Sequence, residues 1–324
     1  MNPPSQYVHP GEGLPEVTQE AKVFDPEELY EVDSELPELT GAVLLHQLDG
    51  FVDAGLAGKA VSEHLESRLE YTVAARFDVD RLIDYRARRP MMTFAADHWA
   101  GYEAPELAVK LFHDEAGTPF LLLTGPEPDH EWERYAAAVR SLVERWELRM
   151  VVSYQGIPMG APHTRPLGVT AHATRKELVG EYQQVLNRLQ VPGSATGLTE
   201  FRLGEAGHDA VGFAAHVPHY LAQSRYPAAG VTLLGSISRV AGLSVPDEAL
   251  VESARRTDAE IARQVAESDE VAEVVRALEQ QYDTFVEAMD RKSLLAEEVE
   301  QMPTAEELGA EFERFLAEQQ DRGE

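Results

Sequence analysis

The sequence contains no cysteine, so disulfide bonds, thiol catalysis and metal sites built from thiolates are all excluded. It also lacks a run of about 18 apolar residues, the length that a membrane-spanning helix needs. Its first residues, MNPPS, are polar and do not have the basic and apolar regions of a signal peptide. We therefore expect no membrane span and a cytoplasmic protein.

Basic residues are scarce. The chain has 28 Lys and Arg against 57 Asp and Glu, which gives a formal net charge of −29. Residues 1–40 hold 10 acidic residues and 1 basic residue, and residues 247–324 hold 23 and 8, so the charge is concentrated at the two ends. Nucleic acids and anionic membranes are bound through clustered Lys and Arg, so we expect neither as a partner. Acidic helices of this kind are typical of a surface that keeps a protein soluble.

Composition and periodicity divide the 324 residues into three parts. Residues 1–40 form an acidic, Pro-rich arm with few periodic apolar positions, which predicts a largely irregular segment. Residues 41–246 alternate strand-like and helix-like patterns, which indicates an α/β domain. Residues 247–324 form an acidic, amphipathic helical segment.

The first strand–helix unit lies at residues 41–68. Residues 41–48 predict a strand, residues 49–55 a glycine-bearing turn and residues 56–68 a helix with apolar positions at helical spacing. This order is typical of the first unit of an α/β fold.

A second unit lies at residues 120–165. Residues 120–123 predict a strand, residues 132–146 a helix and residues 150–152 another strand, an order that favours a parallel pair. We expect residues 153–165 to form an irregular loop at the carboxyl edge of the sheet, because this stretch with Pro166 contains two Gly, three Pro, one His and one Arg.

The remaining segments predict further elements and complete the α/β pattern. The expected strands are 71–77, 91–95, 109–113, 169–173 and 211–216; the expected helical segments are 179–189, 218–221, 228–234 and 271–289; the expected flexible turn is 193–197. A capping box at Thr304 and Glu307 predicts the start of a last helix.

Glycines at residues 50–59 suggest a phosphate-binding loop, but the spacing does not fit. No Gly-Lys-Ser/Thr follows the first glycine at the required distance, Ala60 stands where a metal-binding hydroxyl is needed, and Asp49 and Asp53 would repel phosphate. We expect these glycines to serve a tight turn and close helix packing.

Two other chemistries lack a complete set of residues. His216 and His219 have the spacing of one helical turn, but Pro218 interrupts it and no third metal ligand is nearby, so we expect structural or loop-lining histidines. No Gly-x-Ser-x-Gly motif is present, which argues against a serine hydrolase. We assign no catalytic residue and expect no metal and no cofactor.

Several polar residues follow strands that we expect to be parallel, where open α/β sheets form ligand crevices. The candidate crevice consists of Asp49, Asp53, Glu127, Asp129, Gln155, His163 and Arg165. Two interpretations remain open. These side chains form a pocket for a small polar ligand, or a hydrolase site with carboxylate and His in acid and base roles; alternatively, they cap strand ends and helix starts.

Five motifs give the chain a family resemblance. They are LDGFVDAG at 48–55, FDVDRLIDYRARRP at 77–90, YQGIPM at 154–159, AHVPHYL at 215–221 and PTAEELGAEFERFL at 303–316. Together they span nearly the whole chain. The chain resembles the proteasome assembly chaperone family, of the second chaperone type, in its actinobacterial branch.

The resemblance implies a phosphorylase-like, three-layer α/β/α sandwich with a mostly parallel sheet and a C-terminal helical appendage. It also implies a self-associating protein, such as a trimer, with proteasome subunits as partners, because archaeal and eukaryotic relatives are non-catalytic escorts of proteasome α-subunits. Our first hypothesis is a non-catalytic, homo-oligomeric protein-binding protein. The alternative is an enzyme or binding protein for a small nucleoside-like ligand at the crevice.

Overall fold

The structure is a computed structural model that describes residues 25–180, 182 and 189–300. Within these residues, one eight-stranded sheet organises the chain. In spatial order its strands are β1 (Tyr30–Val32), β3 (Tyr71–Phe77), β6 (Ala108–His113), β7 (Pro119–Pro126), β2 (Val43–Asp49), β8 (Met150–Met159), β10 (Ala210–Pro218) and β9 (Val169–Ala173).

The sheet is mixed. Strands β7, β2, β8 and β10 form a parallel centre, whereas β1, β3 and β6 on one side and β9 on the other pair antiparallel with their neighbours. Strands β7 and β8, which the sequence predicts as a parallel pair, do run parallel, but β2 lies between them. The carboxyl ends of β7, β2, β8 and β10 therefore meet at one edge of the sheet.

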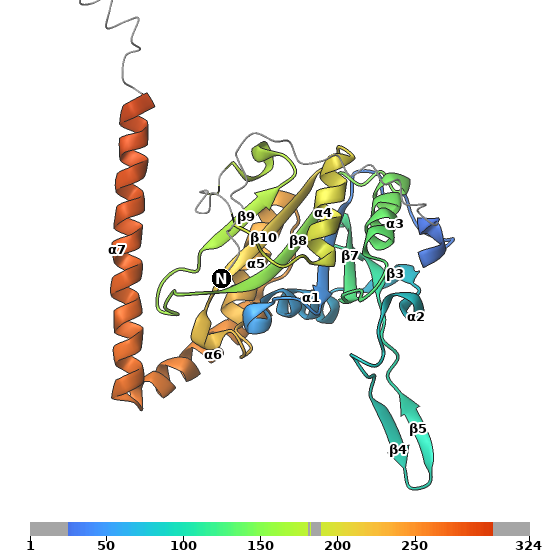
Figure 1. The fold of residues 1–324 in the computed structure, drawn as a ribbon, viewed down its shortest axis with the longest axis horizontal. Coiled ribbons are helices and arrows are strands. Elements are labelled where there is room, and N and C mark those ends of the chain that lie inside the picture. Colours follow the sequence, from blue (N-terminus) through green and yellow to red (C-terminus); the bar gives the residue numbers. More distant parts are fainter. Residues whose placement is uncertain (1–24, 181, 183–188, 301–324) are drawn as a thin grey trace, which may run out of the picture.

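Helices cover both faces of the sheet, which confirms the predicted α/β/α sandwich (Figure 1). On one face lie α3 (Trp132–Arg145) and α4 (Ala195–Glu205); on the other lie α1 (Ala57–Arg68) and α5 (Pro227–Ala241), with α6 (Glu248–Ala266) packed on α5. The apolar runs of the central strands alternate between the two cores. In β2, Leu44 joins the core under α3, and Val43 and Leu45 join the core under α1 and α5.

Short helices complete the described elements. They are the 3₁₀ helices η1 (Pro26–Leu29), η2 (Ala54–Leu56), η3 (Lys176–Val179) and η4 (His219–Leu221), and the single-turn helix α2 (Val79–Leu82). Helix η2 leads directly into α1 and shapes the loop after β2.

The expectation of an irregular N-terminal arm is wrong for β1. This strand pairs with β3, and Leu29 and Tyr30 are buried in the core. Three strand residues are too few to give a periodic pattern, so the sheet edge supplies the order that the local sequence does not indicate. Residues 1–24 lie outside the described part of the chain.

The loop expected at residues 153–165 is also wrong in its first half. Strand β8 continues to Met159, because its backbone stays in parallel register with β10 as far as Met159 and Pro218. Pairing with a neighbouring strand here overrides the local turn signal of Gly156 and Pro158.

Residues 193–197, expected as a flexible turn, contain the start of α4. Ser194 is the N-cap of this helix, and its side chain accepts a hydrogen bond of 3.0 Å from the backbone N–H of Gly197. Of the polar helix expected at 179–189, residues 181 and 183–188 lie outside the described residues, as does the capping box at Thr304.

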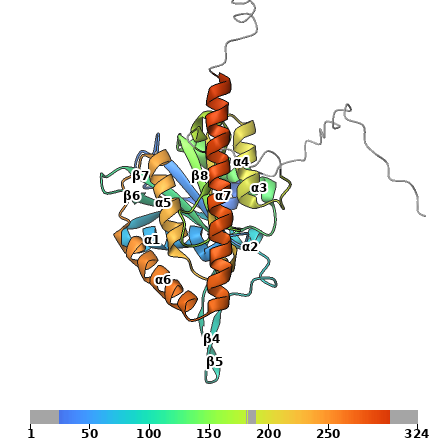
Figure 2. The same cartoon turned by 90° about the vertical axis from the view of Figure 1, so that its left-hand side faces the viewer.

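Helix α7 (Asp269–Glu300) confirms the predicted long helix, and it stands beside the body of the fold (Figures 1 and 2). The segment before β9 contacts it. Arg165 forms ion pairs of 2.7 Å with Asp283 and 3.3 Å with Glu279, and Tyr282 donates a hydrogen bond of 3.0 Å to the carbonyl of Pro166.

A two-stranded hairpin, formed by β4 (Met92–Ala95) and β5 (His98–Tyr102), projects away from the rest of the fold (Figure 1). The sequence predicts β4 but not β5. The rings of Phe94 and Trp99 face each other across the strands with centroids 5.1 Å apart. In the described part of the chain, no helix is long and apolar enough to cross a membrane.

Candidate functional site

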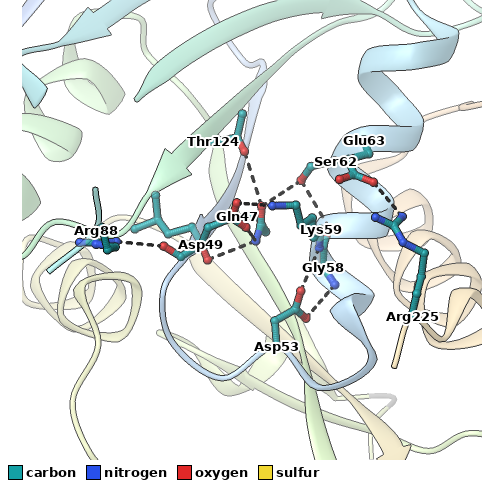
Figure 3. A network of polar contacts seen from close by, with 11 residues as sticks. Gln47, Asp49, Asp53, Gly58, Lys59, Ser62, Glu63, Arg88, Thr124 and Arg225 are labelled. Carbon is teal, nitrogen blue, oxygen red and sulfur yellow. Dashed lines mark hydrogen bonds and ion pairs between the residues drawn. The ribbon is translucent and has the colours of Figure 1, made fainter. Parts of the chain in front are cut away.

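Asp53 organises the edge where the parallel strands end. Its carboxylate accepts hydrogen bonds from the backbone N–H groups of Gly58 (2.9 Å), Lys59 (3.0 Å) and Gly156 (2.8 Å) (Figure 3). Gly58 and Lys59 lie in the first turn of α1, where free N–H groups and the helix dipole favour an anion. The position that would hold a phosphate in a phosphate-binding loop is therefore occupied by the chain's own carboxylate.

The third hydrogen bond ties β8 to the loop after β2. The approach is so close that a Cβ atom at residue 156 would lie 2.1 Å from the backbone oxygen of Ala54, so only glycine fits. Burial raises the pKa of Asp53, and the three N–H donors oppose this shift by stabilising the charged form.

Beside Asp53, a second polar network surrounds Gln47 and Asp49 (Figure 3). Asp49 forms an ion pair of 2.7 Å with Lys59. Ser62 donates to the Gln47 side chain over 3.3 Å and lies 3.0 Å from the hydroxyl of Tyr154. These contacts join the end of β2, the first turns of α1 and the middle of β8 into one polar layer under the sheet edge.

A cavity of about 490 Å³ opens at this edge, a volume within the range of small-molecule sites. Its polar lining residues are His46, Gln47, Asp53, Glu127, Ser153, Gln155, His172, Ser194, Thr196 and Glu200; its larger apolar ones include Leu48, Phe51, Val52, Trp132, Tyr154, Val191, Leu198 and Phe213.

The seven sequence-predicted crevice residues are divided between two regions. Asp53, Glu127 and Gln155 line the cavity. Asp49 is paired with Lys59 and does not line it. Asp129 forms an ion pair of 2.6 Å with Arg88.

The other two do not line the cavity and lie near α7. The Nδ1 atom of His163 is 2.7 Å from the hydroxyl of Tyr220, and Arg165 is paired with acidic residues of α7. The expected convergence of all seven residues does not occur, because β8 carries the chain past the cavity before the loop begins.

The cavity also contains a histidine–carboxylate pair that sequence reasoning missed. The Nδ1 atom of His172 lies 2.7 Å from Oε1 of Glu200. The His172 ring occupies space left by Gly212, where a Cβ atom would lie 2.0 Å from the ring Cε1. Burial opposes the charge on His172, but the hydrogen bond and charge of Glu200 outweigh it and raise the pKa of this imidazole. The sequence offers one signal for this pair. Gly212 lies in the middle of the apolar strand β10, and a glycine there indicates that another group approaches the strand closely.

His46, also at the cavity, has the opposite electrostatic environment. Its Nε2 atom lies 2.9 Å from the hydroxyl of Tyr135, and burial lowers the pKa of His46 from 6.5 to about 4. His46 is therefore neutral at pH 7 and serves as a hydrogen-bonding core residue.

The described residues contain no group of three or more His, Cys, Asp or Glu side chains placed to hold a metal. His216, considered above as a metal ligand, instead contacts the hydroxyl of Thr170 at 2.8 Å. The arrangement offers carboxylates, amides and one polarised imidazole beside aromatic walls, which suits recognition of a small polar molecule.

Comparison with known proteins gives a consistent assignment. Residues 47–265 match the model of the PAC2 family. No curated protein sequence matches the chain.

Solved structures match over most of the chain. A Mycobacterium tuberculosis protein of unknown function is 43% identical, with 90% of this chain and 96% of that one covered and a TM-score of 0.79. A Corynebacterium glutamicum protein of unknown function is 37% identical, with 80% and 98% covered and a TM-score of 0.77. A proteasome-assembly chaperone homologue from Mycobacterium tuberculosis is 26% identical, with 72% and 99% covered and a TM-score of 0.66.

Replacing Asp53 tests the anchor of the site. We expect Asp53→Ala to lower the free energy of unfolding by about 2–4 kcal/mol, because three backbone N–H groups lose their acceptor. Asp53→Asn retains one acceptor oxygen and should lose about half as much. Urea unfolding measures both, and Glu70→Ala, at an exposed position outside the hairpin, is the matched control. Equal stability of all three variants and the parent chain would contradict the anchoring role.

The pKa of His46 predicts a pH dependence. Below pH 6.5 the unfolded chain binds a proton at His46 that the folded chain does not bind until about pH 4. Stability should therefore fall as the pH drops through this window, by about 3 kcal/mol from this residue alone. His46→Gln should flatten the dependence in urea unfolding between pH 7 and 4. An unchanged slope in His46→Gln would contradict the assignment.

Proposed function

The chain belongs to the PAC2 family, and we propose that it is a non-catalytic, homo-oligomeric protein-binding protein in proteasome assembly or a related step. The relative described as a proteasome-assembly chaperone homologue supports the proteasome connection. A cytoplasmic setting fits a chain without cysteine, and a trimer is one symmetric form that such an oligomer can take.

The observation that carries the proposal is the surface of the β4–β5 hairpin. Its large apolar side chains are exposed, with 68% of Met91, 56% of Phe94 and 63% of Trp99 accessible to solvent, and Met92 and Tyr102 are also exposed. A group of exposed aromatic and Met side chains on two neighbouring strands is typical of a protein-interaction surface. The hairpin projects from the fold, so the body of its own chain does not cover it (Figure 1).

We infer that a second copy of the chain covers the hairpin. In a symmetric contact, each copy contributes the same patch, so five exposed side chains become ten. Fully covered aromatic side chains bury about 150–250 Å² each, and roughly half of each of these side chains is still exposed, so ten of them approach the about 1,200 Å² at the lower end of specific interfaces. Residues 91–103 contain only two acidic residues, Asp97 and Glu103. Electrostatic repulsion between two copies, each with a net charge of −29, is therefore weak at the hairpin.

One observation favours a second candidate function. The cavity at the carboxyl edge of the parallel strands has the volume and mixed lining of a small-molecule site. The alternative is therefore an enzyme or binding protein for a small nucleoside-like ligand.

Removing the hairpin aromatics tests self-association. We expect the parent chain to be oligomeric by light scattering at micromolar concentration and the double variant Phe94→Ala/Trp99→Ala to be monomeric. Because both side chains are exposed and project from the body of the fold, the double variant should stay folded, with the far-UV circular dichroism of the parent chain. The matched control is Phe201→Ala, which removes an exposed aromatic ring from α4 and should leave the oligomer intact. A monomeric parent chain would contradict the proposal.

The proteasome role is tested by affinity capture from proteasome-containing cells, under conditions that preserve assembly intermediates. We expect the parent chain to recover proteasome subunits. If an oligomeric chain recovers none, the proteasome role is wrong while self-association stands.

A further inference from the structure

The charge of the cavity at the sheet edge limits what it can bind. Three carboxylates line it, from Asp53, Glu127 and Glu200, and no Lys or Arg is among its lining residues in the described part of the chain. His172, whose pKa is raised, is already paired with Glu200, so a ligand bearing phosphate or carboxylate would meet mainly like charge.

Two of the helix N-termini at this edge, those of α1 and α4, are already capped by carboxylates of the chain itself. Asp53 accepts from the first turn of α1, and Oε1 of Glu127 accepts a hydrogen bond of 2.8 Å from the backbone N–H of Ala195, the first residue of α4. Helix N-termini are the usual anion sites of α/β folds. An anionic ligand therefore cannot use the N–H groups at the starts of α1 and α4.

Unused acceptors remain next to the cavity. In the described part of the chain, Oε2 of Glu127 accepts no hydrogen bond, and neither does the buried Oε2 of Glu200, whose other oxygen contacts His172. A carboxylate oxygen near a partly enclosed cavity is stabilised by a charged hydrogen-bond donor.

The remaining lining is largely apolar and aromatic. Phe51, Trp132 and Phe213 contribute rings, and Val52 and Val191 contribute aliphatic surface. Aromatic faces attract cations and pack against flat apolar groups. The side-chain amide of Gln155, which forms no hydrogen bond among the described residues, adds a neutral polar contact.

We propose that this cavity binds a small organic cation, a primary amine with an apolar or aromatic body, whose ammonium group pairs with the carboxylate of Glu127. The body of the ligand lies against the aromatic lining. Glu200, which lies on α4, adds negative potential. The inference rests on the second candidate function, ligand binding in the cavity, and specifies the charge of the ligand.

The test is calorimetric titration with three probes of different charge: tryptamine as the amine, adenosine as the neutral nucleoside and ribose 5-phosphate as the anion. We expect tryptamine to bind and ribose 5-phosphate not to bind. Glu127→Gln should weaken tryptamine binding by about 10- to 100-fold, because it removes a charge-assisted hydrogen bond. The glutamine retains an acceptor for the N–H of Ala195, so the start of α4 is preserved.

Two further variants make the result specific. Glu103→Gln removes one negative charge at an exposed site outside the cavity and should leave the affinity for tryptamine unchanged. Val191→Lys places a competing cation at an exposed lining position and should weaken tryptamine binding, even if Glu127→Gln fails to fold.

Binding of adenosine without binding of tryptamine would overturn the charge inference and leave the candidate ligand site standing. Binding of none of the three probes would overturn the inference and remove the support for the ligand-binding function. Tryptamine affinity that is equal in the parent chain, Glu127→Gln and Val191→Lys would place the amine elsewhere and overturn the inference.

Discussion

The carboxylate of Asp53 is the contact on which the arrangement of the sheet edge depends. It gathers backbone N–H groups from the first turn of α1 and from β8 at 2.8–3.0 Å. This contact draws β8 so close to η2 that residue 156 has to be glycine. The position of β8 in turn sets the register of β10 and the wall of the cavity. One buried acceptor with three donors thus holds together elements that are about a hundred residues apart in the sequence.

The same principle gives the edge its chemical character. At α1 and again at α4, an acidic side chain of the chain satisfies the free N–H groups of a helix start. An α/β fold usually offers such positions to anionic ligands. Here Asp53 and Glu127 occupy these positions at α1 and α4. The cavity is lined by carboxylates, amides and aromatic rings. The surface proposed for protein binding is a different one, since the exposed hairpin lies in the excursion between β3 and β6.

Much of the fold could be predicted from the sequence, because the central strands are continuous apolar runs and α3 has a clear helical period. Elements that depend on distant partners could not. Strand β1 is ordered by pairing with β3, and the end of β8 by pairing with β10. For the site, Asp53, Glu127 and Gln155 follow from the rule for strand ends, whereas the pair of His172 and Glu200 forms only through the packing of β9 against α4 over Gly212.

The central functional claim is that the β4–β5 hairpin is covered by another copy of the chain. Amide hydrogen exchange of residues 91–103, measured over a concentration series, tests it most directly, because an exposed hairpin exchanges quickly unless a partner protects it. We expect amide exchange of the hairpin to slow as the protein concentration rises through the range of association. Exchange in the central strands should stay unchanged. Exchange of the hairpin that stays equally fast at every concentration, in a chain that light scattering shows to be oligomeric, would contradict it.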